Sequence, residues 1–200
     1  MNGGPAGGVA VWGGVMAALV LGFAPAGFAD PVQHGRVSRW EYRAGYGYQY
    51  TNTSRPNHFE LIQLLPSAVV PLGGPTGPSW FRGKWEWNPE LQLALFTHPY
   101  IRPLIGVTPI QFRWVFETPC RFKPYGTIGA GILYANINRR ETRKDLNFNL
   151  QGALGTFVEL NEATSLILEY RHVHVSNAGL HEDNAGMNNH TFLAGISFKK

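Results

Sequence analysis

The sequence predicts an all-β protein, an eight-stranded antiparallel β-barrel. Segments of about 9 to 15 residues alternate polar with apolar side chains, which is the period of a strand. Stretches rich in Pro, Gly, Asn and Ser separate these segments, as turns do. Beyond the N-terminal stretch, no apolar run is long enough for a membrane helix, so strands are the remaining way for this chain to cross a membrane.

Residues 1–29 predict an export signal that is cleaved after Ala29. They contain no charged side chain, and residues 9–23 are almost wholly apolar or small. A basic residue near Met1, which export signals carry, is lacking, and a transmembrane anchor is the alternative interpretation. The apolar run is shorter than the roughly 20 residues that a span needs, which favours the signal. Residues 30–200 then form one exported β-barrel domain.

Aromatic alternation marks the first half of the predicted barrel. From residue 41 to 50, tyrosines and Ala44 oppose charged residues, glycines and Gln49, so the strand has one apolar and one polar face. From residue 80 to 96, aromatic residues oppose charged ones until the phase changes near Pro89, which predicts a β-bulge. The prolines and glycines of residues 71–78 exclude regular structure there. The predicted strands of this half cover residues 41–50, 58–70, 80–96 and 104–116.

Glycines and amides mark the second half. The fifth strand is rich in glycine, which suits a crowded barrel wall, and the sixth opposes aliphatic side chains with Asn and Gln. On the seventh strand, Leu166, Leu168 and Tyr170 share a face with His172, His174 and Ser176. The predicted elements are a turn at 117–121, a strand at 122–136, a basic loop at 137–145, a strand from Leu146, a turn at 161–163, a seventh strand ending at Ser176, a loop at 177–189 and a strand at 190–198.

Two kinds of barrel fit this alternation. In an outer-membrane barrel the apolar face meets lipid, whereas a soluble lipocalin-like barrel holds its aromatic residues in the core. Tyr and Trp near strand ends (Tyr48, Tyr50, Trp80 and Trp85) are typical of membrane girdles and favour the first kind, in a Gram-negative outer membrane. Charged strand residues are then internal ion pairs or, in a soluble barrel, ordinary surface: Glu41, Arg43, Arg82, Lys84, Glu86, Glu169 and Arg171.

A histidine and a serine on the seventh strand form the candidate site. Residues two apart on a strand share a face, so the side chains of His174 and Ser176 lie roughly 6 to 7 Å apart along it. Such a pair is the minimum for an activated oxygen nucleophile, given a group that orients the imidazole and donors for the oxyanion. Because the pair shares the apolar face and lies at the outer end of its strand, the sequence predicts a membrane-lipid substrate.

The segment His174-Val175-Ser176-Asn177-Ala178-Gly179, followed by Asn184-Ala185-Gly186-Met187-Asn188, resembles the outer-membrane lipid A 3-O-deacylases and related acyloxyacyl hydrolases. These are eight-stranded barrels that hydrolyse an ester-linked acyl chain of lipopolysaccharide. The resemblance implies that Ser176 is the nucleophile and His174 the general base, with Asn184 and the Gly179 N–H as oxyanion donors and Asn177 as a supporting amide. The family has an acidic residue where this chain has Asn188. An amide can accept the imidazole N–H bond but cannot stabilise the imidazolium by charge, and Glu182 or Asp183 is an alternative partner for His174.

Other interpretations stay open at this point. A non-catalytic barrel with a lipid-binding or structural role is the alternative to the esterase. The basic loop is either solvated or a binding site for lipid A phosphates; its basic residues are Arg139, Arg140, Arg143 and Lys144. The histidines at 172, 174, 181 and 190 are a weak metal signal, so we expect neither a metal nor a cofactor. The basic run is too short to predict nucleic-acid binding, and Cys120 is interpreted as a passive turn residue.

Overall fold

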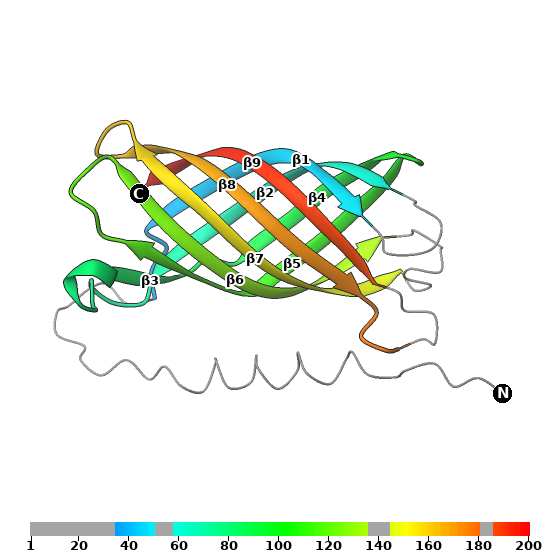
Figure 1. Ribbon diagram of the computed structural model, residues 1–200, viewed down its shortest axis with the longest axis horizontal. Coiled ribbons are helices and arrows are strands. Elements are labelled where there is room, and N and C mark those ends of the chain that lie inside the picture. The colour runs from blue at the N-terminus through cyan, green and yellow to red at the C-terminus, as the bar shows by residue number, and fades with distance from the viewer. Residues whose placement is uncertain (1–34, 51–57, 136–144, 181–185) are drawn as a thin grey trace. The chain divides into compact units, whose positions relative to one another are not determined.

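The computed structural model describes residues 35–50, 58–135, 145–180 and 186–200, in which antiparallel strands close into a ring (Figure 1). The predicted export signal, residues 1–29, lies outside the described residues. The strands are β1 (Arg39–Tyr50), β2 (Phe59–Pro71), β3 (Gly83–Trp87), β4 (Glu90–His98), β5 (Arg102–Phe116), β6 (Phe122–Ala135), β7 (Leu146–Glu159), β8 (Thr164–Ser176) and β9 (Met187–Lys199). Pairing of β1 with both β2 and β9 closes the barrel.

The predicted third strand is divided into β3 and β4 by a break at Asn88 and Pro89. Both pieces pair with β2 on one side and β5 on the other, so the nine strand segments make an eight-stranded wall. Asn88 is fully buried, its N–H donates to the Gln111 carbonyl, and the Ala68 N–H donates to the Pro89 carbonyl. The phase change in the sequence is therefore a real interruption of the strand.

The two largest differences between predicted and observed strand starts are at the third and the last predicted strand. The third strand was expected from Trp80, but residues 79–81 form a short 3₁₀ helix, η1 (Ser79–Phe81), whose Phe81 ring stacks on Trp114 at 5.2 Å. The last strand begins at Met187 rather than His190, because the chain pairs with β8 from Met187 opposite Val175. Asn188, expected in a loop, therefore lies on a strand.

The outer wall is apolar and aromatic. Along β1 the exposed positions are Trp40, Tyr42, Ala44, Tyr46 and Tyr48, and inward positions alternate with them. Buried polar and charged side chains fill the lumen instead. This inside-out arrangement is that of a membrane barrel and excludes the lipocalin-like alternative. Among the described residues, no helix is long and apolar enough to cross a membrane.

Four arginines and four glutamates form a connected ion network in the lumen, and the partly exposed Lys84 contacts it through Glu86 at 3.5 Å. Arg113 binds both carboxylate oxygens of Glu41 at 2.7 and 2.9 Å, and Arg171 binds Glu90 at 2.6 and 3.0 Å. Because a buried charge is costly unless it is paired, equal numbers of each sign stabilise the network as a unit. All eight side chains are buried: Arg39, Glu41, Arg43, Glu86, Glu90, Arg113, Glu169 and Arg171. Arg82 differs, because its partly exposed side chain pairs with Glu117 outside the lumen.

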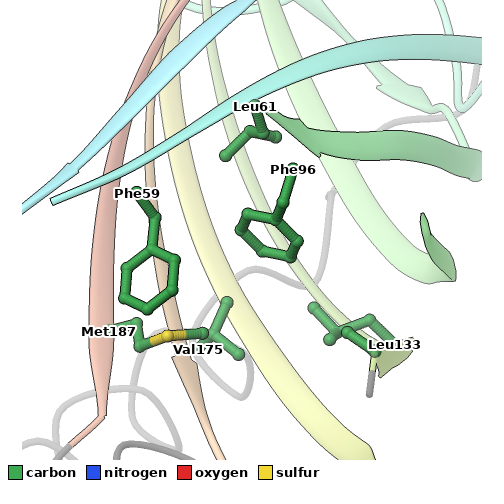
Figure 2. Packing of buried hydrophobic residues seen from close by; sticks show 7 residues of the cluster. Phe59, Leu61, Phe96, Leu133, Val175 and Met187 are labelled. Carbon is green, nitrogen blue, oxygen red and sulfur yellow. The ribbon is translucent and has the colours of Figure 1, made fainter. Parts of the chain in front are cut away.

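An apolar cluster fills the lumen at the outer end, which we define as the end where β8 finishes and β9 begins. Figure 2 shows Phe59, Leu61 and Phe96 meeting Val175 and Met187 across this end. Amides bridge the space between this cluster and the ion network, for example Asn149 to Gln92 at 2.9 Å. The lumen between the outer end and the ion network is therefore packed with side chains, and the polar groups of the predicted site face the other way.

Candidate active site

The predicted site lies on the outer wall at the outer end of β8. Buried and outward positions alternate along this strand, and His172, His174 and Ser176 take outward positions in line with Leu166, Leu168 and Tyr170. Asn177, one residue beyond the strand, is fully buried. The face predicted from the alternation is the face observed.

His174 is held by Asn188. The two residues are directly opposite in the β8–β9 register, and His174 Nδ1 lies 2.9 Å from Asn188 Oδ1. Because a carbonyl oxygen only accepts hydrogen bonds, Nδ1 carries the proton in this contact and Nε2 keeps its lone pair. That is the tautomer in which Nε2 can take a proton from a hydroxyl group.

Ser176 takes the next outward position after His174 on β8. It is half-buried and pairs in register with Phe148 of β7. Both side chains lie in the described part of the chain, and no hydrogen bond joins the Ser176 hydroxyl to His174 there. Hydrogen bonds of catalytic pairs often tighten only in the complex with substrate. A rotation of the two side chains toward one another is therefore the step that would complete the pair.

A tight turn follows Ser176. Ala178 and Gly179 have φ of 53° and 80°, and the Leu180 N–H donates to the Asn177 carbonyl at 3.0 Å. The Gly179 N–H, expected to be an oxyanion donor, donates to the Asn177 side-chain oxygen at 2.9 Å. Asn177 therefore bonds within the turn itself, and its role as a supporting amide stays a prediction. Gly179 can meet an oxyanion only by sharing or releasing this bond.

Gly186 leaves room for the imidazole of His174 and was not among the predicted site residues. Its φ is 69°, and a Cβ added to it would lie 2.9 Å from His174 Cε1 and 3.4 Å from Nε2. A side chain there would push the imidazole away from its place. The sequence signal was present, since Gly186 lies in the segment that carries the resemblance, but nothing local in the sequence says which ring it meets.

The rings of Tyr170, His172 and His190 lie next to His174 and Asn188 on the outer wall. The Tyr170 hydroxyl is 2.6 Å from His190 Nδ1, and the His172 and His190 ring centres are 4.7 Å apart. In the described part of the chain, no group of three or more His, Cys, Asp or Glu side chains could hold a metal ion. Cys120 is exposed in the turn between β5 and β6, away from the outer end.

Several predicted site residues lie outside the described residues. These are Asn184, Glu182, Asp183, Arg139, Arg140, Arg143 and Lys144.

Comparisons with known proteins identify the family and the fold of this chain. A family model described as lipid A 3-O-deacylase (PagL) matches residues 72–197, and no curated protein matches. The crystal structure of the outer membrane enzyme PagL superimposes with a TM-score of 0.58 at 16% identity, covering 76% of this chain and 97% of that one.

Neisserial surface protein A superimposes with a TM-score of 0.54 at 10% identity, covering 80% of this chain and 97% of that one. At such identities the two solved structures show a common outer-membrane barrel fold. The family model spans more than half of the sequence, including the strands of the site, and the chain therefore belongs to the lipid A 3-O-deacylase (PagL) family.

Proposed function

We propose that this protein is a carboxylic ester hydrolase that removes an ester-linked acyl chain from lipid A in the outer membrane, with Ser176 as nucleophile and His174 as general base. The observation that carries the proposal is the 2.9 Å contact between His174 Nδ1 and Asn188 Oδ1 on the outer wall. It supplies the oriented imidazole that a serine nucleophile requires. The apolar wall around it suits a substrate that stays in the membrane.

The first half of the reaction forms an acyl-enzyme. The Ser176 hydroxyl attacks the ester carbonyl carbon while its proton passes to His174 Nε2, which gives a tetrahedral oxyanion. Asn184 and the Gly179 N–H are the proposed donors to this oxyanion. When the intermediate collapses, the bond to the sugar oxygen breaks, and that oxygen takes the proton from His174. The acyl chain remains on Ser176.

The second half releases the fatty acid. Water attacks the acyl carbon and gives a proton to His174 Nε2, and the bond to Ser176 Oγ breaks as that oxygen regains the proton. Asn188 keeps the imidazole in the productive tautomer through both halves but adds no negative charge. Since a carboxylate would stabilise the imidazolium in each transition state, we infer that this site works below the rate of an acidic variant.

Fatty-acid release from lipopolysaccharide by the full chain in detergent micelles tests the proposal. Ser176→Ala is expected to lower kcat by about four orders of magnitude, since a triad acts as a unit. Folding of the variant is checked by heat-modifiable mobility in a gel. Ser165→Ala is a matched control, because Ser165 lies on the same strand but faces the lumen at the opposite end.

Two results would overturn the esterase. One is a folded wild-type protein that releases no fatty acid, and the other is a Ser176→Ala variant as active as wild type. Either would favour the alternative, a small barrel with a lipid-binding or structural role.

A further inference from the structure

Histidine is confined to one place in the described barrel. All five histidines among the described residues lie on the outer wall toward the outer end, near or at the ends of β2, β4, β8 and β9. They are His58, His98, His172, His174 and His190. His174 belongs to the proposed active site, which leaves four imidazoles beside it without an assigned role.

These imidazoles lie along one row of paired strand residues. The register runs from His172 on β8 to His190 on β9, then to Tyr48 on β1, Glu60 on β2 and His98 on β4. His172 is one outward position from His174. The row therefore starts beside the proposed active site and ends at the last residue of β4.

Ring contacts join two groups within the row, and the pairing of His190 with Tyr48 in the β1–β9 register connects the two groups. His172 and His190 are 4.7 Å apart, Tyr48 stacks on His58 at 5.8 Å, and His58 stacks on His98 at 4.4 Å. We call these five side chains the imidazole row. Among the described residues, the Glu60 carboxylate lies beside the row, 3.9 Å from His58 Nε2.

A bulge brings His98 into the row. Along β4, Glu90, Gln92 and Phe96 face the lumen, so regular alternation would turn His98 inward. A register shift opposite Glu60 and Leu61 adds one residue to β4 there, and His98 comes out beside Glu60. The fold thus departs from a regular strand at the position that extends the row.

The wall on the other side of Ser176 has a different character. Ser176 pairs with Phe148 of β7, which pairs with Ile132 of β6, and His174 pairs with Leu150. All three apolar partners are exposed. Ser176 therefore lies at a boundary between an apolar wall on β6 and β7 and polar rings on β9, β1, β2 and β4.

Polar rings on a lipid-facing wall need polar partners, because polar groups facing hydrocarbon are costly. An imidazole that makes one contact through Nδ1, as His190 does to Tyr170, has a second nitrogen for a ligand. Ring N–H and imidazolium groups donate charge-assisted hydrogen bonds to phosphate oxygens. The apolar wall on β6 and β7 suits an acyl chain. The sugar headgroup of the same lipid would then lie on the opposite side of Ser176, over the imidazole side chains.

We propose that the imidazole row is a binding surface for the phosphorylated sugar headgroup of the lipid substrate. The proposal rests on the proposed function, because it places the headgroup next to the ester that Ser176 attacks. The row adds recognition of the phosphate, a selectivity that the Ser176–His174 pair alone does not have.

The kinetic test compares lipid A carrying its phosphates with the same lipid after dephosphorylation, using the full chain in detergent micelles. The variant replaces four imidazoles: His58→Gln, His98→Gln, His172→Gln and His190→Gln. KM for the phosphorylated lipid is expected to rise about tenfold, since hydrogen bonds to a charged group are lost. KM for the dephosphorylated lipid and kcat for both stay within about twofold of wild type, as loss of uniform binding predicts.

Tyr134→Phe is the matched control, because Tyr134 is an exposed polar ring near the end of β6, on the apolar side of Ser176. It leaves the ratio of the two KM values unchanged. An equal rise of KM for both lipids in the variant with four substitutions would make the row a general membrane contact and overturn the proposal. An unchanged ratio would overturn it as well.

A second measurement separates this inference from the proposed function. The Ser176→Ala chain with labelled histidine rings is titrated with the fully deacylated disaccharide, with and without phosphates, and ring signals are followed by NMR. Saturable shifts at His172 and His190 with the phosphorylated sugar alone support the row even if wild type releases no fatty acid. If wild type is active and neither sugar shifts these signals, the row fails while the esterase stands.

Discussion

Strand β8 carries polar residues on both of its faces, and the two faces differ in how these side chains are paired. On the lumen side, Glu169 and Arg171 are buried and lie in a network where each charge meets at least one opposite charge. On the outer side, the hydrogen-bond partner of His174 among the described residues is the neutral side chain of Asn188. The paired charges stabilise the barrel, and the proposed function assigns the reaction to the outward residues.

The largest expected effect comes from removing one charge from the ion network in the lumen. Glu169 accepts hydrogen bonds from Arg43 at 2.9 Å, Arg171 at 2.7 Å and the Tyr125 hydroxyl at 2.7 Å. Glu169→Gln leaves buried arginines short of one charge and is expected to lower the free energy of unfolding by about 3 to 5 kcal/mol. Urea titration in lipid vesicles, followed by gel mobility, measures the loss.

The control is an ion pair outside the lumen. Glu117 pairs with Arg82 at 2.6 Å, but both side chains are about half exposed. Glu117→Gln is expected to cost less than about 1 kcal/mol, as exposed pairs do. If the two variants lost equal stability, the contrast between the lumen and the surface would be wrong.

The second-largest expected effect is a loss of activity on the outer face, caused by a substitution at Gly186. An alanine there would place its Cβ 2.9 Å from His174 Cε1, so the imidazole would have to move from the position in which the proposed reaction needs it to meet Ser176. Gly186→Ala is expected to lower kcat about 100-fold with little change in KM, since misplacement of a catalytic group has such costs. Kinetics with lipid A in micelles provide the measurement.

Backbone strain is separated from this contact by a second glycine. Gly35 also has a positive φ, of 85°, but a Cβ added there meets nothing within 4 Å. Gly35→Ala therefore introduces similar strain without touching the site and should leave kcat unchanged. Equal losses in both variants would show that strain, rather than the position of His174, lowers the activity.

The strands and their faces could be predicted from the sequence because alternation is local. Each of the residues Leu166, Leu168 and Tyr170 reports the face of its neighbours two positions away, so the outward direction of His174 and Ser176 followed directly. The break at Pro89 was visible for the same reason. Neither needed knowledge of a partner strand.

The partners of the site could not be predicted in this way. Nothing in the composition of residues 184–190 marks Met187 as the start of a strand, because amides and glycine dominate there. Only pairing with β8 fixes that start, and with it the position of Asn188 opposite His174. The contact of Gly186 with the imidazole and the row from His172 to His98 depend on the same cross-strand registers.

The smallest expected effect, a gain in activity, tests whether Asn188 is the partner of His174. In Asn188→Asp, a carboxylate of similar size takes the 2.9 Å contact with Nδ1 and adds the negative charge that stabilises an imidazolium. We expect kcat to rise about tenfold, equivalent to roughly 1.4 kcal/mol of transition-state stabilisation. Asn188→Leu keeps the volume but accepts no hydrogen bond, so it should lower kcat because the tautomer is no longer fixed. A loss of activity in Asn188→Asp, or no loss in Asn188→Leu, would mean that another group orients His174, and Glu182 and Asp183 would be the residues to replace next.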